Sequence, residues 1–254
     1  MIRGLYTSTA GMVAHMARQV TISNNLANIS TTGYKQDRTS LEAFYYKLLG
    51  LAYPEAPVGS MTMSPIGTLN TSMGVDQDEI DFSQGQLMET GNALDLALSG
   101  PGFFTIATAD GVCYTRDGSF VRDASGQLVT SDGARVLGVD GPLVLGEGKV
   151  LVEGDGTVLV DGQTVGQLRI ADFPQAGQLR KLGYNRFAPV AGTQETPATS
   201  AVVNQGFLER SNVDAAQSMV EMMEVLRSYE ATQRMIQLQD QTLGASVNQV
   251  GTLA

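Results

Sequence analysis

Apolar residues recur with helical spacing at both ends of the chain, and this spacing disappears in between. Residues 1 to about 29 are predicted to form an amphipathic helix, and residues 212 to about 250 a longer one. The N-terminal row steps by three or four residues through Ile2, Leu5, Thr9, Met12, Met16, Gln19, Ser23 and Leu26. The C-terminal row is Met219, Met222, Leu226, Tyr229, Gln233, Ile236, Asp240, Leu243, Val247 and Val250.

Eight of the ten residues in the C-terminal row are apolar, which fits a coiled-coil seam over several heptads. Gln233 and Asp240 interrupt the row. They predict a seam that is partly hydrated, or one in which polar residues specify the register of the helices. For the N-terminal stretch, a surface helix on a globular core is the simpler alternative. Because a matching stripe lies at the other end of the chain, we expect the terminal helices to pack together or against other copies of the chain.

The middle of the chain is predicted to form antiparallel β hairpins. Asp-Gly pairs, which favour tight turns, occur at 110–111, 117–118, 132–133, 140–141, 155–156 and 161–162. Pro54, Pro57 and Pro65 lie in a stretch with neither helical nor strand periodicity. The predicted fold class is therefore α+β, with a discontinuous terminal-helix assembly domain (1–47 and 204–254), an extended arm or loop (48–75) and a central β domain (76–203).

Composition and charge exclude several classes of function. The net charge of −10 disfavours a general nucleic-acid binder, and no apolar run reaches the ~18 residues of a membrane-spanning helix. The lone Cys113 is expected to be a buried thiol, and the lone His15 to face or pack on the first helix. The acidic residues between 76 and 81 lack the EF-hand pattern. We expect no catalytic residue, no cofactor and no metal site.

Two neighbouring strings carry a resemblance to a known family. Asn24-Asn25-Leu26-Ala27-Asn28, followed by Thr32-Gly33-Tyr34-Lys35, resembles the N-terminal signature of bacterial flagellar rod and hook proteins. The start of the chain, with Ile2-Arg3-Gly4-Leu5-Tyr6-Thr7-Ser8 and Gly11-Met12, is similar to the rod proteins in particular. From the residues alone, an ordinary helix terminus would also explain the Asn-rich stretch.

Further stretches are similar to the same family in the same order. They are Gln84-Gly85 with 90–97 and Gly102-Phe103-Phe104, then 114–120 with 126–129, then Gln205-Gly206-Phe207-Leu208-Glu209 with Ser211-Asn212-Val213, and lastly Met219-Val220 with 227–230. The resemblance thus covers nearly the whole chain, and the segment 48–75 matches only loosely.

The resemblance implies a structural subunit of the flagellar basal-body rod. Such a protein is exported through the flagellar type III apparatus without a cleaved signal and polymerises through its terminal helices. The resulting helical tube transmits torque from the motor to the hook. The implied partners are copies of the chain and other rod and hook proteins, with no nucleic acid and no direct insertion in a membrane.

The motif and the two stripes mark the residues expected at contacts between subunits. They are Leu5, Met12, Asn24, Asn25, Leu26, Asn28, Gly33, Tyr34, Asn212, Met219, Met222, Leu226, Tyr229 and Ile236. Two alternatives remain at this point. One is another flagellar axial protein, such as a hook or hook-associated protein, and the other is a soluble enzyme or binding module whose helices pack on the sheet.

Overall fold

The computed structural model describes residues 2–52, 63–109, 111–174, 176–190, 192–198 and 200–251. The N-terminal half contains α1 (Ile2–Ala27), β1 (Asp37–Ala52), β2 (Met63–Ile80), β3 (Leu87–Glu89), β4 (Leu96–Ser99), β5 (Phe103–Thr108), β6 (Gly111–Thr115) and β7 (Phe120–Arg122). The central part contains β8 (Leu128–Thr130), β9 (Arg135–Gly138), β10 (Gly141–Pro142), β11 (Val150–Val152), β12 (Thr157–Val160), β13 (Gln163–Gln167) and β14 (Ile170–Asp172). The C-terminal part contains η1 (Ala176–Gln178), β15 (Leu179–Gly183), β16 (Arg186–Pro189), β17 (Thr196–Pro197), β18 (Val202–Gln205), β19 (Phe207–Glu209) and α2 (Ala215–Gly251).

These elements form two compact units. The first comprises the described residues within Met1–Asn24, Asp37–Glu79 and Ala216–Ala254, and the second comprises Asn25–Gln36 and Ile80–Ala215. The described parts of residues 48–75 lie in β1 and β2, which pair as a two-stranded sheet, and residues 53–62 lie outside the described residues. The domain boundaries expected from the sequence stay a prediction.

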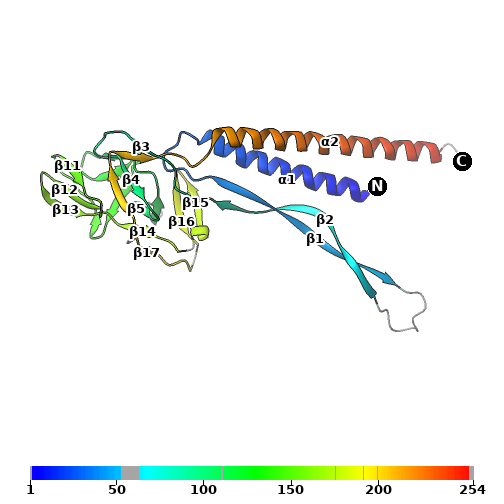
Figure 1. Ribbon diagram of the computed structural model, residues 1–254, viewed down its shortest axis with the longest axis horizontal. Helices are drawn as coiled ribbons and strands as arrows, with labels where there is room; N and C mark the ends of the chain where they lie inside the picture. The colour runs from blue at the N-terminus through cyan, green and yellow to red at the C-terminus, as the bar shows by residue number, and fades with distance from the viewer. Residues whose placement is uncertain are drawn as a thin grey trace. The chain divides into compact units, whose positions relative to one another are not determined.

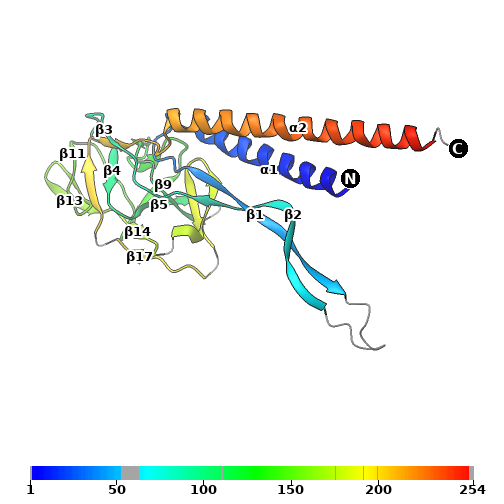
Figure 2. The same ribbon diagram turned by 45° about the vertical axis from the view of Figure 1, so that its right-hand side comes forward.

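In the first unit, α1 and α2 lie side by side and antiparallel, with both chain termini at the same end of the pair (Figures 1 and 2). A Cβ atom on Gly4 would lie 2.7 Å from Nε2 of Gln239, so the two helices approach closely there. At the other end of α1, the Thr39 hydroxyl donates to the Thr21 hydroxyl at 2.7 Å. The predicted α+β class with paired terminal helices is confirmed.

The seam between the two helices uses small side chains. Ala14 and Ile22 of α1 are buried, and so are Ser218 and Val225 of α2. The covered row of α2 continues with half-buried side chains at Met222, Tyr229, Thr232, Ile236, Gln239, Leu243 and Ser246. Met222, Tyr229, Ile236 and Leu243 also belong to the row predicted from the sequence. The predicted residues between them, such as Met219 and Leu226, lie beside the seam and are exposed.

The second unit is an antiparallel β domain, as predicted. Its main sheet has the order β15-β16-β6-β5-β9-β8-β7, with β10 on β9 and with β14 joining β5 to β17. A three-stranded sheet, β11-β12-β13, and two strand pairs, β18-β4 and β19-β3, complete the unit. The C-terminal strands β18 and β19 therefore hold β4 and β3, so residues more than 100 positions apart pair.

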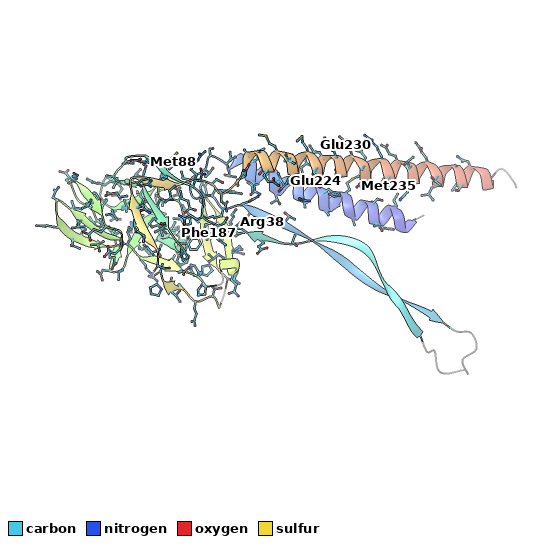
Figure 3. The ribbon with its side chains drawn as sticks, viewed as in Figure 1. Arg38, Met88, Phe187, Glu224, Glu230 and Met235 are labelled. Atoms are coloured by element: carbon cyan, nitrogen blue, oxygen red, sulfur yellow. The ribbon has the colours of Figure 1, made fainter. Side chains whose placement is uncertain are left out.

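The Asp-Gly turns separate these strands. Gly133 and Gly156 have positive φ angles of 85° between paired strands, and Asp161 and Gly162, at 50° and 82°, join β12 to β13. Side chains between the sheets form one aliphatic core around Phe104, Ile106 and Val136. A second, aromatic cluster contains Phe103, Tyr114, Phe173 and Phe187, the last of which is labelled inside the β domain in Figure 3. Cys113 is buried on β6, as predicted.

Tyr114 makes the stability of the β domain sensitive to alkaline pH. Burial, together with the hydrogen bond that its hydroxyl donates to Glu195, raises the pKa of the Tyr114 phenol. A raised pKa in the folded state stabilises the protein below the unfolded pKa of about 10, and this contribution is lost as the pH rises further.

We therefore expect Tyr114→Phe to flatten the fall in stability above about pH 10, and to cost about 1 kcal/mol at neutral pH for the lost hydrogen bond. Urea unfolding at several pH values measures both effects. The control is Tyr184→Phe, at a residue that is largely exposed. Equal slopes for Tyr114→Phe and the unsubstituted protein would show that this phenol does not carry the effect.

Candidate assembly site

The segment that follows α1 packs within the β domain. After α1, the amides of Asn28 and Thr31 donate to the carbonyls of Asn25 and Asn28 at 3.1 and 3.2 Å, which turns the chain out of the helix. The Asn28 side chain accepts a hydrogen bond from the Thr31 hydroxyl at 3.3 Å. The Asn-rich stretch thus ends α1 in consecutive backbone turns.

Gly33 is the point of closest backbone approach. Its φ angle is +66°, and a Cβ atom there would overlap the backbone nitrogen of Asp117 and lie 2.5 Å from the carbonyl carbon of Arg116. Its N–H donates to the carbonyl of Glu209 at 2.8 Å. A residue at this position must therefore combine a left-handed conformation with the absence of a side chain, and only glycine does both.

Polar and cationic groups hold the residues on either side of Gly33. The Thr32 hydroxyl donates to the Asp117 carboxylate at 2.7 Å. The Thr32 carbonyl accepts from the side-chain NH₂ group of Asn185 at 2.8 Å. The Tyr34 hydroxyl donates to the Asn25 side-chain oxygen at 3.0 Å. Lys181 places its ammonium 4.1 Å from the centre of the Tyr34 ring, a cation–π contact.

Lys35 belongs to a buried ion cluster centred on Glu209. Its ammonium donates to Oε1 of Glu209 at 2.6 Å and to the carbonyl of Ser83 at 2.7 Å. Oε2 of Glu209 accepts from Arg116 at 3.3 Å, and the Lys35 and Glu209 side chains are each 1% exposed. The second guanidinium nitrogen of Arg116 donates to the carbonyl of Gly100 at 2.7 Å.

This cluster has a structural role, because Lys35 and Arg116 both pair with Glu209 inside the domain. Burial lowers the pKa of Lys35, and the nearby Glu209 carboxylate offsets part of that effect. Burial also lowers the pKa of Arg116, again against the opposing influence of Glu209. Burying an ion pair costs desolvation free energy that only good geometry repays, so such a cluster specifies one arrangement of the segments that carry it.

Asn212 makes a second connection to the same segment. Its side-chain oxygen accepts the Gln36 amide at 2.8 Å, while its NH₂ group donates to the carbonyl of Asp81 at 2.8 Å. The segment 25–36 is thus fixed to residues 80–85 and to residues 209–212. The segment after α1 and the segment before α2 thus meet in one hydrogen-bonded region of the β domain.

The structure brings together part of the predicted contact set. Asn25, Gly33 and Tyr34 are buried within this region, and Asn28 and Asn212 are half-buried there. On the helices, the half-buried members are Leu5, Met12, Leu26, Met222, Tyr229 and Ile236, and the exposed members are Asn24, Met219 and Leu226. Whether these residues contact partner chains stays a prediction.

Sequence reasoning did not single out Lys35, Arg116 or Glu209. The only available signal was Glu209 itself, an acidic residue directly after the apolar pair Phe207-Leu208 in a short strand. A charged side chain buried in such a strand requires a partner, but the two partners are 174 and 93 positions away.

Two further surveys of the described residues bear on function. Nowhere in that part of the chain do three or more His, Cys, Asp or Glu side chains gather as they would around a metal ion. No described helix is long and apolar enough to cross a membrane.

Paired terminal helices and a β domain that holds the segments next to both helices are the architecture of this chain, and the family models that match it identify the class of flagellar rod and hook proteins. Three family models match the chain: "Flagella basal body rod protein" over residues 5–35, "Flagellar hook protein FlgE/F/G D1 domain" over 97–170, and "Flagellar basal body rod FlgEFG protein C-terminal" over 204–250.

Individual relatives match along nearly their whole length. The flagellar basal-body rod protein FlgG of Borreliella burgdorferi is 34% identical over 263 residues, with 98% of each chain covered. FlgG of Agrobacterium fabrum is also 34% identical, with 94% of this chain and 96% of the relative covered. The hook-basal body complex protein FlhO of Bacillus subtilis is 31% identical, with both chains covered completely.

The chain belongs to the family of flagellar basal-body rod proteins. The resemblance found in the sequence is thereby confirmed, together with a structural role in the flagellar basal body.

Proposed function

We propose that this chain polymerises into the rod through the outward faces of its helix pair, with copies of itself and other rod and hook proteins as partners. In this role it is delivered by the flagellar type III export apparatus and acts without catalysis. The contact residues are those predicted on the helices, of which Met219 and Leu226 lie on the exposed side of α2.

The observation that carries the proposal is apolar surface that remains exposed after α1 and α2 have paired. On α2, Leu226 is 39% exposed and Met235, labelled in Figure 3, is 52% exposed. The remaining large apolar side chains exposed on the two helices are Tyr6, Val13, Met16, Val20, Met219, Val220, Met223, Leu238 and Val247. Contiguous apolar surface of this kind is typical of contacts between protein chains.

The buried segment 25–36 has a different part in this proposal. Its polar groups are bound inside the β domain, so it fixes where the chain leaves α1 and does not itself offer a large free surface. A filament subunit needs such a fixed point, because small angular errors between neighbours accumulate along a helical polymer.

Leu226→Asp tests the proposal. The substitution should change the stability of the isolated chain by less than about 0.5 kcal/mol, because the side chain lies at the surface. A carboxylate buried without a partner in a subunit contact costs several kcal/mol, so rod assembly should be lost. The measurements are urea unfolding of the purified chain, and rod content of basal bodies together with motility of the cells.

Two matched variants separate assembly from folding. Leu226→Met keeps an apolar side chain of similar volume and should assemble normally. Val225→Asp places the charge at a neighbouring position that is only 2% exposed, so it should destabilise the helix pair itself. Normal rods and motility with Leu226→Asp would refute the proposed contact face.

A further inference from the structure

The Asp-Gly pairs of this chain are reactive as well as turn-forming. The backbone nitrogen of the glycine can attack the carboxyl carbon, Cγ, of the aspartate before it and close a succinimide ring, because glycine has no side chain to obstruct the approach. The pairs at 117–118, 132–133, 140–141, 155–156 and 161–162 lie wholly within the described residues. Asp110 of the remaining pair lies outside them. The environment of each carboxylate decides which pair can react in the folded chain.

Backbone and hydroxyl groups bind two of these carboxylates. The Asp117 carboxylate accepts hydrogen bonds from the amide and the hydroxyl of Ser119 at 3.1 and 2.9 Å. The Asp161 carboxylate accepts from the Lys149 amide at 2.9 Å. In both cases these bonds must break before Cγ can turn toward the nitrogen of the following glycine.

Two further carboxylates are bound through both of their oxygens. One oxygen of Asp132 accepts from the Thr130 hydroxyl, and the other pairs with Arg186. The oxygens of Asp155 accept from the amide and the hydroxyl of Thr157, each at 2.9 Å, and these bonds lower the pKa of the Asp155 carboxyl. Such donors favour the charged carboxylate, whereas ring closure requires the neutral acid, whose hydroxyl group can leave as water.

Asp140 differs from these four aspartates. No group in the described part of the chain donates a hydrogen bond to its carboxylate. Val139 and Asp140 connect β9 to β10, and β10 is only the two residues Gly141 and Pro142. A Cβ atom on Gly141 would meet nothing within 4 Å, so the space beside the attacking nitrogen is open.

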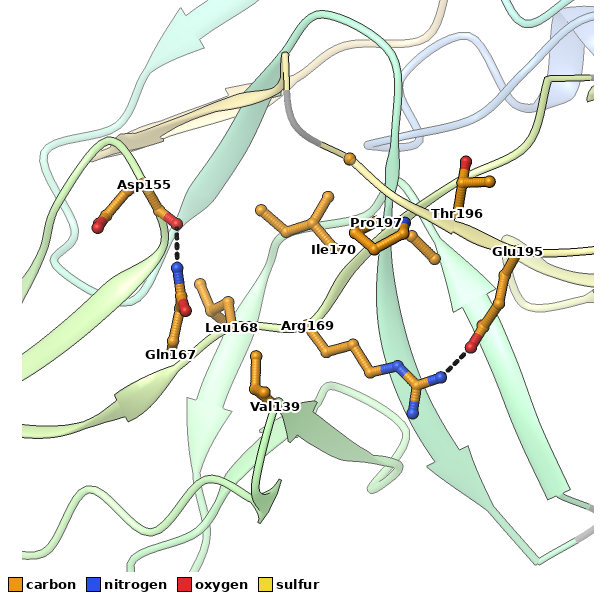
Figure 4. Close-up of a pocket in the computed structure, with 11 residues that line it drawn as sticks. Val139, Asp155, Gln167, Leu168, Arg169, Ile170, Glu195, Thr196 and Pro197 are labelled. Atoms are coloured by element: carbon orange, nitrogen blue, oxygen red, sulfur yellow. Dashed lines mark hydrogen bonds and ion pairs between the residues drawn. The ribbon is translucent and has the colours of Figure 1, made fainter.

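Exposure does not distinguish Asp140 from the other pairs. Asp132, Asp155 and Asp161 are exposed as well. Val139, which precedes Asp140, and Asp155 line the same cavity of about 440 Å³, and Figure 4 labels both. Water therefore reaches both turns, and the hydrogen bonds to the carboxylate are what separates them.

We propose that Asp140 is a site of spontaneous isoaspartate formation in the folded chain. In the first step the Gly141 nitrogen bonds to Cγ of Asp140, and the carboxyl hydroxyl group leaves as water together with the amide proton. Water then opens the ring. Addition at Cγ restores aspartate, whereas addition at the former backbone carbonyl carbon leads the main chain through Cβ and leaves a carboxylate on Cα. The net reaction is an isomerisation and requires no other reactant.

The product should loosen the β9–β10 hairpin, because it lengthens the main chain of the turn by one methylene group. Leu143 directly follows β10, and its side chain is buried in the aliphatic core. Its amide donates to the carbonyl of Val136 at 3.3 Å. The reaction takes place within one chain, so the inference does not depend on the proposed polymerisation.

Heavy-oxygen labelling of the purified full chain tests the proposal. The chain is incubated at neutral pH in heavy-oxygen water, either folded or unfolded in guanidinium chloride, and is then digested with trypsin in ordinary water. Each opening of a succinimide incorporates one heavy oxygen atom. Asp140 is the sole aspartate between Arg135 and Lys149, so one tryptic peptide reports it alone. Fragmentation of the peptides assigns the label at the other pairs.

We expect Asp140 to react at similar rates in the folded and the unfolded chain. Folding should slow Asp117, Asp132, Asp155 and Asp161 by roughly tenfold or more each, because their hydrogen bonds must first be lost. If folding slows Asp140 as much as these four, the proposal is overturned. Equal rates at Asp132, Asp140, Asp155 and Asp161 in the folded chain would also overturn it, because exposure alone would then control the reaction.

Two variants test the chemistry and its cause. Asp140→Glu keeps the charge of the exposed turn but places the carboxyl carbon one bond further away, so the labelled peptide should disappear. Thr157→Val removes the hydroxyl donor of Asp155, so Asp155 should react faster in the folded chain while Asp140 is unchanged. Label that persists with Asp140→Glu, or an unaltered rate at Asp155 with Thr157→Val, counts against the proposal.

Discussion

Replacing Gly33 by Ala should destabilise the β domain by about 2–6 kcal/mol. The left-handed conformation at φ +66° costs a residue with a side chain about 1–3 kcal/mol. The new Cβ would also press on the backbone of Arg116 and Asp117, and overpacking of this kind costs about 1–3 kcal/mol. The shift in the urea midpoint of the purified chain, with an unchanged slope, measures the sum.

Gly91→Ala separates the two contributions. Gly91 has a φ angle of +72°, close to that of Gly33, but a Cβ atom there would meet nothing within 4 Å. This control should therefore lose only the conformational contribution, about 1–3 kcal/mol. Equal losses for the two variants would mean that the backbone at residues 116–117 moves aside easily, and that the segment around Gly33 is not tightly held.

Local patterns predicted the two helices and the hairpins of the β domain, but they gave no strand signal in 48–75, where the described residues lie in β1 and β2. The helical rows predicted helices over 1–29 and 212–250, and the structure has them at Ile2–Ala27 and Ala215–Gly251. The Asp-Gly pairs predicted antiparallel hairpins because two residues with positive φ angles are a local requirement of tight turns. Each of these signals depends only on residues close together in the sequence.

The seam between the helices was harder to predict. The apolar period selects Met219 and Leu226, since they are large and apolar, whereas the structure buries Ser218 and Val225 between the helices. Small residues permit close packing but contribute little to a hydrophobic pattern. Met219 and Leu226, the larger side chains beside this seam, remain exposed in the single chain.

The buried region around residues 25–36 could not be derived from local patterns. The Asn-rich stretch is compatible with an ordinary helix terminus, and α1 ends within it, at Ala27. Its main partners, however, are Asp117, Asn185 and Glu209, which pairing across the fold brings close. Lys35 illustrates the limit, because nothing near it in the sequence indicates that its charge is buried.

Glu209→Gln should be among the most destabilising substitutions of a single side chain in this protein. The carboxylate accepts hydrogen bonds from Lys35, Arg116 and the Gly85 amide. Gln retains one acceptor oxygen but turns an NH₂ group toward donors, and it deprives two buried cations of the carboxylate that they share. We expect a loss of about 3–5 kcal/mol in the free energy of unfolding, measured by urea unfolding at neutral pH.

Lys35→Met should cost less than Glu209→Gln, although the Lys35 ion pair is the shorter of the two at 2.6 Å against 3.3 Å. The reason is net charge: without Lys35, Glu209 still pairs with Arg116, and the buried cluster becomes neutral. The remaining cost is one of the two hydrogen bonds to the Ser83 carbonyl, which still accepts from the Asn212 side chain, and this is about 1 kcal/mol. A larger loss for Lys35→Met would show that pair distance, and not the charge balance of the cluster, sets its stability.

The double variant gives the sharper result. When Glu209→Gln is already present, Lys35 is a buried cation without its carboxylate, so adding Lys35→Met removes an unfavourable charge. The double variant should therefore be more stable than Glu209→Gln alone, although it carries one substitution more. Such coupling is expected only between residues in one electrostatic network. Simple addition of the two losses would indicate that the cluster relaxes or admits water when Glu209 is replaced, and that its charges do not act together in the folded domain.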